Sequence, residues 1–329
     1  MHNDYFFVMG SSQKLQQIRI PNRLNTLLTL LVFTTSIALL AFSEQSLYWQ
    51  ILMIIAFAHL HMTSYALLHE ATHLNLHSKP RYNYVLGFLS GLLFPTSITL
   101  ATLTHTKHHC CNRSNHEMFD YYYPNDNLFL KFGQWYSLLL GGFWPLVLLG
   151  NLVLCIYPRL PQNPWVLRIK SSQRMLEDLQ DYHIRKIRLE TFSILLFWLG
   201  MFFFTPLTWK TCLLFYLVAG WNWSTRQYIT HAFSKRDVWQ GAWNLKTNII
   251  HEKILLNGNW DLEHHLNPEL PWLYLAKSGK TRGYHRPYLR QYALLWLGPR
   301  KNFERAPLAI PREEYFKGYH ESTTTDVPA

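Results

Sequence analysis

The sequence predicts an all-α integral membrane protein with two transmembrane helical hairpins, interfacial or re-entrant helices, and a cytoplasmic helical cap. Only 16% of the 329 residues are charged, whereas an average soluble domain carries roughly 25%. Long apolar stretches occur in pairs, and a short polar break separates the members of each pair. Lys and Arg outnumber Asp and Glu by 31 to 20, and a basic surplus around apolar stretches is typical of a cytoplasmic membrane face. Disordered, collagen-like and disulfide-rich classes are excluded by this composition.

The first hairpin is expected over residues 27–43 and 47–68. Glu44 is the only Asp, Glu, Lys or Arg between positions 27 and 69, and it lies in the polar break. A spanning helix needs about 20 apolar residues, so the two stretches cross out and back. Residues 1–26 contain Lys14, Arg19 and Arg23. We therefore expect a cytoplasmic N-terminal segment followed by an uncleaved first span.

The second hairpin is expected over residues 189–207 and 209–229, and Lys210 is the only charge after Glu190 up to Thr225. Two further apolar stretches, 84–104 and 134–157, are predicted to be interfacial or re-entrant. Residues 158–190 carry seven Lys and Arg side chains and belong in the cytoplasm. Residues 134–157 must then enter and leave on one side, with a bend at Gly141-Gly142. A plain crossing by 84–104 remains the alternative.

Residues 230–320 are polar, rich in proline and aromatic residues, and lack an apolar run long enough to span a membrane. They predict a cytoplasmic helical cap, which completes a single membrane domain over 27–320. We expect residues 321–329 to form a disordered tail. The four cysteines show no metal-binding spacing and are expected to be reduced and structural.

Histidines are numerous, 17 in all, and many of them cluster with helical spacing. Residues three and four apart share one face of a helix, so each cluster directs its side chains to one point. All the clusters lie at predicted cytoplasmic ends of membrane segments. They are His69-Glu70-Ala71-Thr72-His73, His105-Thr106-Lys107-His108-His109, Asp261-Leu262-Glu263-His264-His265, and the pair Gln227 and His231.

The clusters predict a site for two metal ions. Eight or nine nitrogen and oxygen ligands exceed the need of one zinc, because catalytic zinc takes three protein ligands and a water. Imidazole and carboxylate ligands without thiolate favour iron that reacts with O₂. Glu70 and Glu263 are candidates for orienting the ligand imidazoles.

The pattern HxxxH, HxxHH and [HQ]xxHH across paired membrane hairpins resembles the membrane fatty acid desaturase superfamily, the di-iron desaturases and hydroxylases with three histidine boxes. The resemblance covers roughly His59 to Leu275 and includes the segment Asn257-Gly258-Asn259-Trp260 before the third box. It implies that the box histidines bind two irons, that His231 is a further ligand, and that Gln227 reaches iron through a water. The box histidines are His69, His73, His105, His108, His109, His264 and His265.

Asp261 departs from the family pattern, because the third box of the superfamily begins with His or Gln. A carboxylate is a good iron ligand, so we expect Asp261 in or next to the metal site. A helix cap is the structural alternative. The substitution is also compatible with an outcome other than desaturation.

The resemblance implies an O₂-dependent oxidoreductase that acts on a lipid acyl chain, with desaturation as the favoured reaction. Hydroxylation, oxidative decarboxylation and carotenoid-type oxygenation use the same site and stay open. Two readings outside the superfamily are an intramembrane zinc protease with Glu70 as general base and a histidine-rich metal transporter. Of these, the protease leaves the second histidine box without a role.

Electrons must come from another protein, because the chain has no GxGxxG unit, no CxxCH motif and no fused cytochrome-like domain. The net charge of +11 favours an acidic donor such as a ferredoxin or a cytochrome. We expect a substrate presented as acyl-CoA, acyl-ACP, free fatty acid or phospholipid, contact with membrane lipids, and no nucleic acid. The expected location is the bacterial inner membrane, or the endoplasmic reticulum of a eukaryote, with the metal site on the cytoplasmic face.

Overall fold

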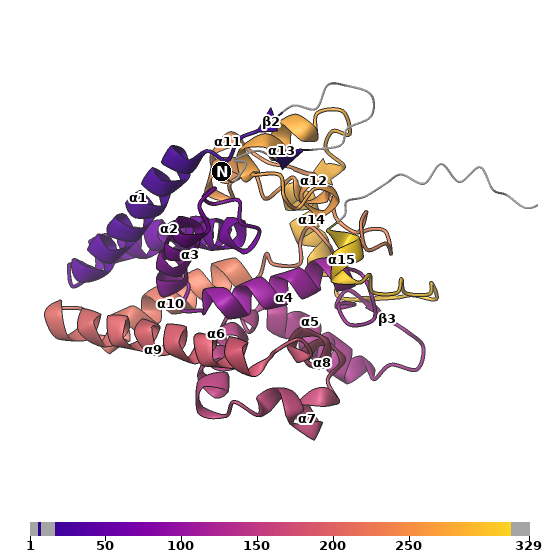
Figure 1. Ribbon diagram of the computed structural model, residues 1–329, viewed down its shortest axis with the longest axis horizontal. Helices are drawn as coiled ribbons and strands as arrows, with labels where there is room; N and C mark the ends of the chain where they lie inside the picture. The colour runs from indigo at the N-terminus through magenta and orange to yellow at the C-terminus, as the bar shows by residue number, and fades with distance from the viewer. Residues whose placement is uncertain (1–5, 8–16, 317–329) are drawn as a thin grey trace, which may run out of the picture.

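The computed structural model describes residues 6–7 and 17–316 (Figure 1). The predicted tail over 321–329 and most of the basic N-terminal segment lie outside the described residues. The described chain is mostly helical, as the sequence predicts. Its helices are α1 Asn22–Ala41, α2 Leu47–Thr72, α3 Pro80–Leu93, α4 Ile98–Cys111, α5 Leu128–Leu139, α6 Phe143–Ile156, α7 Pro164–Leu167, α8 Lys170–Leu176, α9 Asp181–Phe204, α10 Trp209–Ser224, α11 Ile249–Ile254, α12 Asp261–Leu266, α13 Trp272–Ser278, α14 Tyr288–Leu295 and α15 Arg312–Tyr315, with a 3₁₀ turn η1 at Leu160–Gln162.

The strands are short, and each pair connects two separate segments of the chain. Each pair consists of two-residue strands, and the parallel pairs β3–β6 and β4–β5 tie the C-terminal region to earlier parts of the chain. The strands are β1 Phe6–Phe7, β2 Gln17–Ile18, β3 Tyr121–Tyr122, β4 Leu245–Lys246, β5 Arg286–Pro287 and β6 Arg300–Lys301. The β1–β2 pair is antiparallel.

Three described helices, α1, α2 and α9, are long and apolar enough to cross a membrane. Two further pairs pass the same test only when combined, and both pairs are sharply bent: α3 and α4 by 95°, and α5 and α6 by 93°. The second bend includes the Gly141-Gly142 pair at which the sequence predicts one. If each bent pair counts as one span, up to five segments are long enough to cross.

The predicted span over 209–229 ends earlier than expected. Helix α10 stops at Ser224 and has 16 residues, fewer than the roughly 20 that a straight crossing needs. Beyond it the backbone forms tight turns, because the N–H of Arg226 donates to Trp223 O and that of Ile229 to Arg226 O. Gln227 and His231 therefore lie in turns and not on a helix. The cap predicted to be helical consists, over residues 230–316, of five short helices joined by turns and loops.

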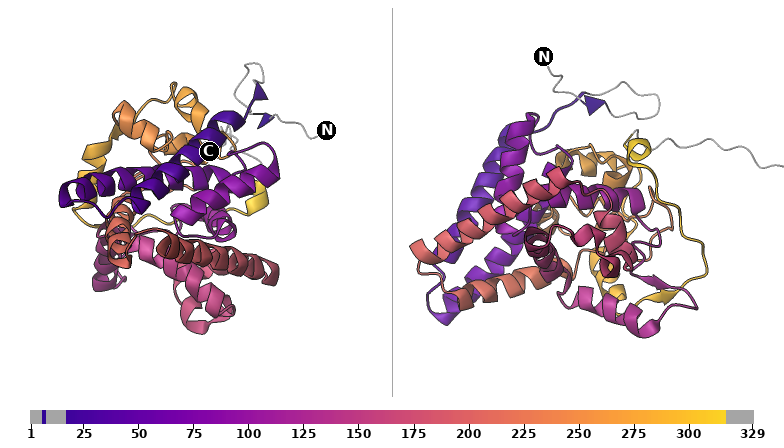
Figure 2. Two further views of the ribbon diagram at one scale, coloured as in Figure 1. Left: turned by 90° about the vertical axis from the view of Figure 1, so that its left-hand side faces the viewer. Right: turned by 60° about the horizontal axis from the view of Figure 1, so that its bottom comes forward.

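Helix α2 lies at the centre of the molecule and packs against α1, α3, α4 and α10. Its side chains Phe57, Leu67 and Leu68 are almost fully buried, so α2 is anchored on several sides by apolar contacts. In Figure 1 the long helices α1 and α9 extend to the left, while α12, α14 and α15 lie to the right. The right-hand view of Figure 2 shows the same separation from another direction.

Polar side chains inside the apolar helices connect them to the cap. Asn25 of α1 donates to the carbonyls of Asn75 and Leu76 at 3.2 and 2.9 Å, and its Oδ1 accepts the indole N–H of Trp272 at 3.0 Å. All three groups are buried, and buried polar groups are stabilising only when they are paired. The first helix is thereby fixed to the start of α13, far along the chain.

The bend between α3 and α4 is held by close backbone packing and by buried hydrogen bonds. A Cβ at Gly91 would lie 2.6 Å from Thr96 O, so only glycine allows the chain to return this closely. Asn151 of α6 accepts the N–H of Ser97 at 2.9 Å and donates to Thr96 Oγ1 at 2.8 Å. These contacts fix the direction in which α4 leaves the bend.

Glu190 of α9 is the main polar anchor of this bend, and we predict that Glu190→Ala destabilises the protein by about 3 kcal/mol. Its buried carboxylate accepts hydrogen bonds from Tyr84 at 2.8 Å, from Thr99 Oγ1 at 2.7 Å and N–H at 3.0 Å, and from Ser97 Oγ. Each buried group left without a partner costs about 1–3 kcal/mol. Thermal unfolding of the detergent-solubilised protein measures the loss.

Glu44→Ala is the matched control, because Glu44 is exposed and the hydrogen bond that it accepts from the Thr208 N–H is long, at 3.3 Å. A change within about 0.5 kcal/mol is expected for such a surface site. Equal unfolding temperatures for the two variants would contradict the anchoring role of Glu190.

Candidate metal centre

Four segments that are distant in the sequence bring the predicted ligands together. They are the C-terminal end of α2, helix α4, the turns after α10, and helix α12. The histidines form two groups, in each of which the potential ligand atoms all lie within 4.8 Å of one another. The first group is His69, His73, His105 and His264, and the second is His108, His231 and His265.

His109 completes the first group. Its Nε2 lies 3.2 Å from Nε2 of His73 and 3.0 Å from those of His105 and His264. Its ring centroid is also 4.5 Å from that of His265, so this side chain is close to both groups. The helical spacing of α4 explains this, because His105, His108 and His109 share one face of the helix.

Asp261 completes the second group. Its Oδ2 lies 3.1 Å from His231 Nε2 and 3.9 Å from His265 Nε2. The residue is at the first position of α12, directly after the N-cap residue Trp260. The sequence predicts that Asp261 lies with the histidines. In the structure its carboxylate points toward His231 and His265.

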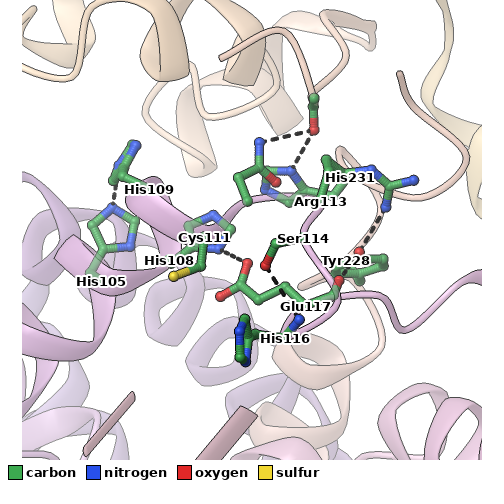
Figure 3. Close-up of polar contacts among 12 residues, drawn as sticks. His105, His108, His109, Cys111, Arg113, Ser114, His116, Glu117, Tyr228 and His231 are labelled. Atoms are coloured by element: carbon green, nitrogen blue, oxygen red, sulfur yellow. Dashed lines mark hydrogen bonds and ion pairs between the residues drawn. The ribbon is translucent and has the colours of Figure 1, made fainter. Parts of the chain in front are cut away.

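In several of the imidazole rings Nδ1 contacts a neighbouring group, so Nε2 is the atom that faces the other ligands (Figure 3). His108 Nδ1 lies 2.7 Å from the Glu117 carboxylate, and His231 Nδ1 lies 3.0 Å from Gly241 O. Both acceptors require a proton on Nδ1, so Nε2 keeps its lone pair. His109 Nδ1 lies 3.0 Å from the Tyr315 hydroxyl. This arrangement is typical of histidines that bind a metal through Nε2.

The arrangement of the donor atoms fits bound cations. A single N–H serves only one of the three contacts at His109 Nε2, so the other nitrogen lone pairs face one another at about 3 Å. Asp261 Oδ2 and His265 Nε2 are buried and have no hydrogen-bond partner among the described residues. Buried polar atoms without partners are costly, and a metal ion at each group satisfies them.

Burial also keeps the ligands in the form that binds metal. Desolvation, with the nearby histidines adding to it, holds the pKa of His264 and that of His265 well below the usual range. Desolvation likewise lowers the pKa of His231, although the Asp261 carboxylate opposes that shift. The three imidazoles are therefore neutral near pH 7, which metal coordination requires.

A buried network fixes Glu117, the partner of His108. Arg113 forms an ion pair with Asp120 at 2.8 Å and donates to the Tyr228 hydroxyl at 2.8 Å. That hydroxyl in turn donates to the backbone carbonyl of Glu117. Figure 3 shows the chain of contacts from Arg113 through Tyr228 to the loop that carries Glu117. A paired, buried network of this kind gives the acceptor of His108 one position.

The other residues predicted near the metals, Glu70, Glu263 and Gln227, have different surroundings. Glu70 Oε1 lies 3.8 Å from His69 Nδ1, while its Oε2 accepts the N–H of Trp272 at 3.0 Å. Glu263 contacts Asn244, Ser278 and Arg282, which assigns it to the cap. Gln227 lines the same cavity as the histidines, and its amide donates to Trp223 O at 3.3 Å.

Two partners of the histidines were not found by sequence reasoning. Glu117 follows His108 by nine residues in an irregular loop, and Tyr315 is 206 residues away from His109. Glu117 is an acidic residue shortly after the second box, and acidic residues can orient ligand imidazoles. Its position in the sequence is therefore a weak signal for this role. Nothing in the spacing indicates Tyr315.

A cavity of about 660 Å³ opens onto the histidines. Apolar side chains of α4, α6, η1 and α8 line one part of it, and the turns after α10 together with Leu255 and Leu256 line another. Tyr65, Phe94 and Trp223 pack against one another with ring centroids 4.8–5.1 Å apart and form an aromatic wall beside His69. The cavity is suited to an elongated apolar molecule.

The profile of the family described as fatty acid desaturase matches residues 45–296. This range is most of the chain and contains all nine residues of the two ligand groups. Comparison with curated proteins gives no match.

We predict that Glu117→Ala lowers metal affinity by about 10–100-fold, because loss of the partner that orients a ligand imidazole has this effect in metal sites. Metal content after dialysis against a chelator measures it. Glu117→Gln retains an acceptor and should lie between the variant and the wild type. Glu304→Ala, at an exposed position, serves as control. Full metal retention in Glu117→Ala would contradict the role assigned to this residue.

Proposed function

The chain belongs to the fatty acid desaturase family, and we propose that it is a membrane-bound, O₂-dependent di-iron oxidoreductase that desaturates a lipid acyl chain. The observation that carries the proposal is the pair of ligand groups, His69, His73, His105, His109 and His264 on one side and His108, His231, His265 and Asp261 on the other. Imidazole and carboxylate donors without thiolate suit iron.

Two irons held by these residues would supply the chemistry that uses O₂ and electrons from the external donor to break an unactivated C–H bond. The protein has to hold the ligands, exclude water and position one part of the acyl chain beside them. Burial of His109, His264 and His265 excludes bulk water from the ligand atoms. The aromatic wall of Tyr65, Phe94 and Trp223 provides a rigid surface against which an acyl chain packs.

The other components of the reaction follow from charge and topology. The net charge of +11 favours an acidic electron donor, such as a ferredoxin or a cytochrome, which docks near the histidines. The basic segment between α6 and α9 favours a cytoplasmic location for the metal site. The membrane is then the bacterial inner membrane, or the endoplasmic reticulum of a eukaryote.

Asp261 supports a second candidate, hydroxylation or oxidative decarboxylation at the same site. It occupies the position where the superfamily has His or Gln, and it lies among the ligands of one group. A carboxylate ligand lowers the net positive charge of its metal site. That favours hydroxylation or decarboxylation over formation of a double bond. The geometry of Glu70 gives little support to a zinc protease, because its carboxylate is engaged by the backbone of Trp272.

The proposal is tested by mass spectrometry of lipids from cells that express the wild type and His265→Ala. We expect an altered acyl product with the wild type only, about two irons per wild-type chain, and an unchanged amount of inserted protein in both. His265 is a buried ligand candidate, whereas insertion depends on the apolar helices. One zinc per chain, or equal products from the two proteins, would overturn the proposal.

Substitutions of Asp261 separate a ligand from a helix cap. We predict that Asp261→Ala strongly lowers iron content and activity, because His231 and His265 lose the only carboxylate that lies within 4 Å of their Nε2 atoms in the described chain. Asp261→His should keep iron and change the ratio of products. Iron content by elemental analysis and product analysis are the measurements, and full activity of Asp261→Ala would assign the residue a structural role.

A further inference from the structure

One basic side chain lines the cavity that leads to the histidines. Among the described residues that line it, Arg226 is the only Lys or Arg. The other walls are mostly apolar, aromatic or hydroxyl-bearing; besides the metal-site histidines and Asp261, the polar exceptions are the amides of Gln134 and Gln227 and the carboxylates of Glu70 and Glu117. A cation at the wall of a largely apolar cavity is costly unless an anion compensates it.

Arg226 lacks such an anion within the described protein. No described carboxylate lies within 4 Å of its guanidinium, and its side-chain contact is with His251 Nε2 at 3.4 Å. Burial, with Arg226 as the next cause, lowers the pKa of His251 to about 4. The histidine is therefore neutral and accepts from the guanidinium without balancing its charge. Most of the five N–H donors of the arginine stay available.

Arg226 lies in the same run of turns as His231 and lines the same cavity. It belongs to the turns after α10, in which the N–H of Ile229 donates to Arg226 O at 3.2 Å and that of His231 to Tyr228 O at 3.3 Å. Its guanidinium reaches His251 of α11. Gln227 and Thr230, from the same turns, also line the cavity.

We infer that Arg226 binds the carboxylate of a free fatty acid whose acyl chain occupies the cavity. The inference rests on the proposed function and names the chemical form of its substrate. A guanidinium matches a carboxylate with two parallel hydrogen bonds. The acyl chain then runs from the guanidinium along the apolar walls of the same cavity, which also contains the histidines.

Binding to the full-length protein in nanodiscs of zwitterionic lipid tests the inference, with radiolabelled lauric acid and its methyl ester as probes. Arg226→Gln should weaken binding of laurate about ten- to a hundredfold, which is the range for loss of a charge-assisted hydrogen bond, and leave binding of the ester unchanged. Arg226→Lys should retain part of the affinity for laurate. Arg290→Gln, at an exposed position on α14 that does not line the cavity, is the matched control and should bind laurate as the wild type does.

Three results would overturn the inference. They are wild-type affinity for laurate in Arg226→Gln, an equal loss of affinity for laurate and ester, and a preference for lauroyl-CoA over laurate that depends on Arg226. If Arg226→Gln binds laurate normally while iron-dependent oxidation of acyl chains persists, only this inference fails. If the protein holds no iron, the proposed function fails and the binding data still test Arg226.

Discussion

The mutual approach of eight imidazoles and one carboxylate is the constraint on which the rest of the structure depends. Nitrogen lone pairs that face one another at about 3 Å repel unless cations lie between them, and neither group folds into place by local preference. Each segment that carries a ligand is therefore held from outside the cluster. Helix α2 is held by the apolar core, α4 by the bend before it, and α12 by the cap.

The bend between α3 and α4 allows the chain to leave the site after α2 and to return to it in α4. His73 ends α2 and His105 lies in α4, and the two ring centroids are 4.7 Å apart. The 31 residues between them must leave the site and return on the same side. A turn of 95° achieves this within two short helices, and it is stabilised by Gly91, by Asn151 and by the carboxylate of Glu190. The residues of the bend thus serve the metal site although none of them touches it.

Features of the site that follow from local spacing could be predicted from the sequence. Features that depend on contacts between distant segments could not. The spacing of His105, His108 and His109 predicts a shared helix face, because that relation is fixed by helix geometry alone. The place of His231 in tight turns, and of Tyr315 against His109, depends on contacts between distant segments. The early end of α10 has the same origin, because the segment that follows the helix is bonded to the loop of residues 112–120 through Tyr228. Local sequence patterns carry no information about such contacts.

The two ligand groups differ in charge, and this asymmetry connects the sequence departure at Asp261 to chemistry. One group offers imidazoles alone, whereas the other combines three imidazoles with a carboxylate. A carboxylate is a harder ligand that partly neutralises the charge of its metal. The surroundings match this difference. The group with the carboxylate also has Glu117 behind His108, so two negative charges converge on that side of the centre. Arg226, the one Lys or Arg among the described residues of the cavity wall, belongs to the same turns as His231. The turns that supply a ligand to the more negative group thus also supply the cation with which an anionic substrate pairs.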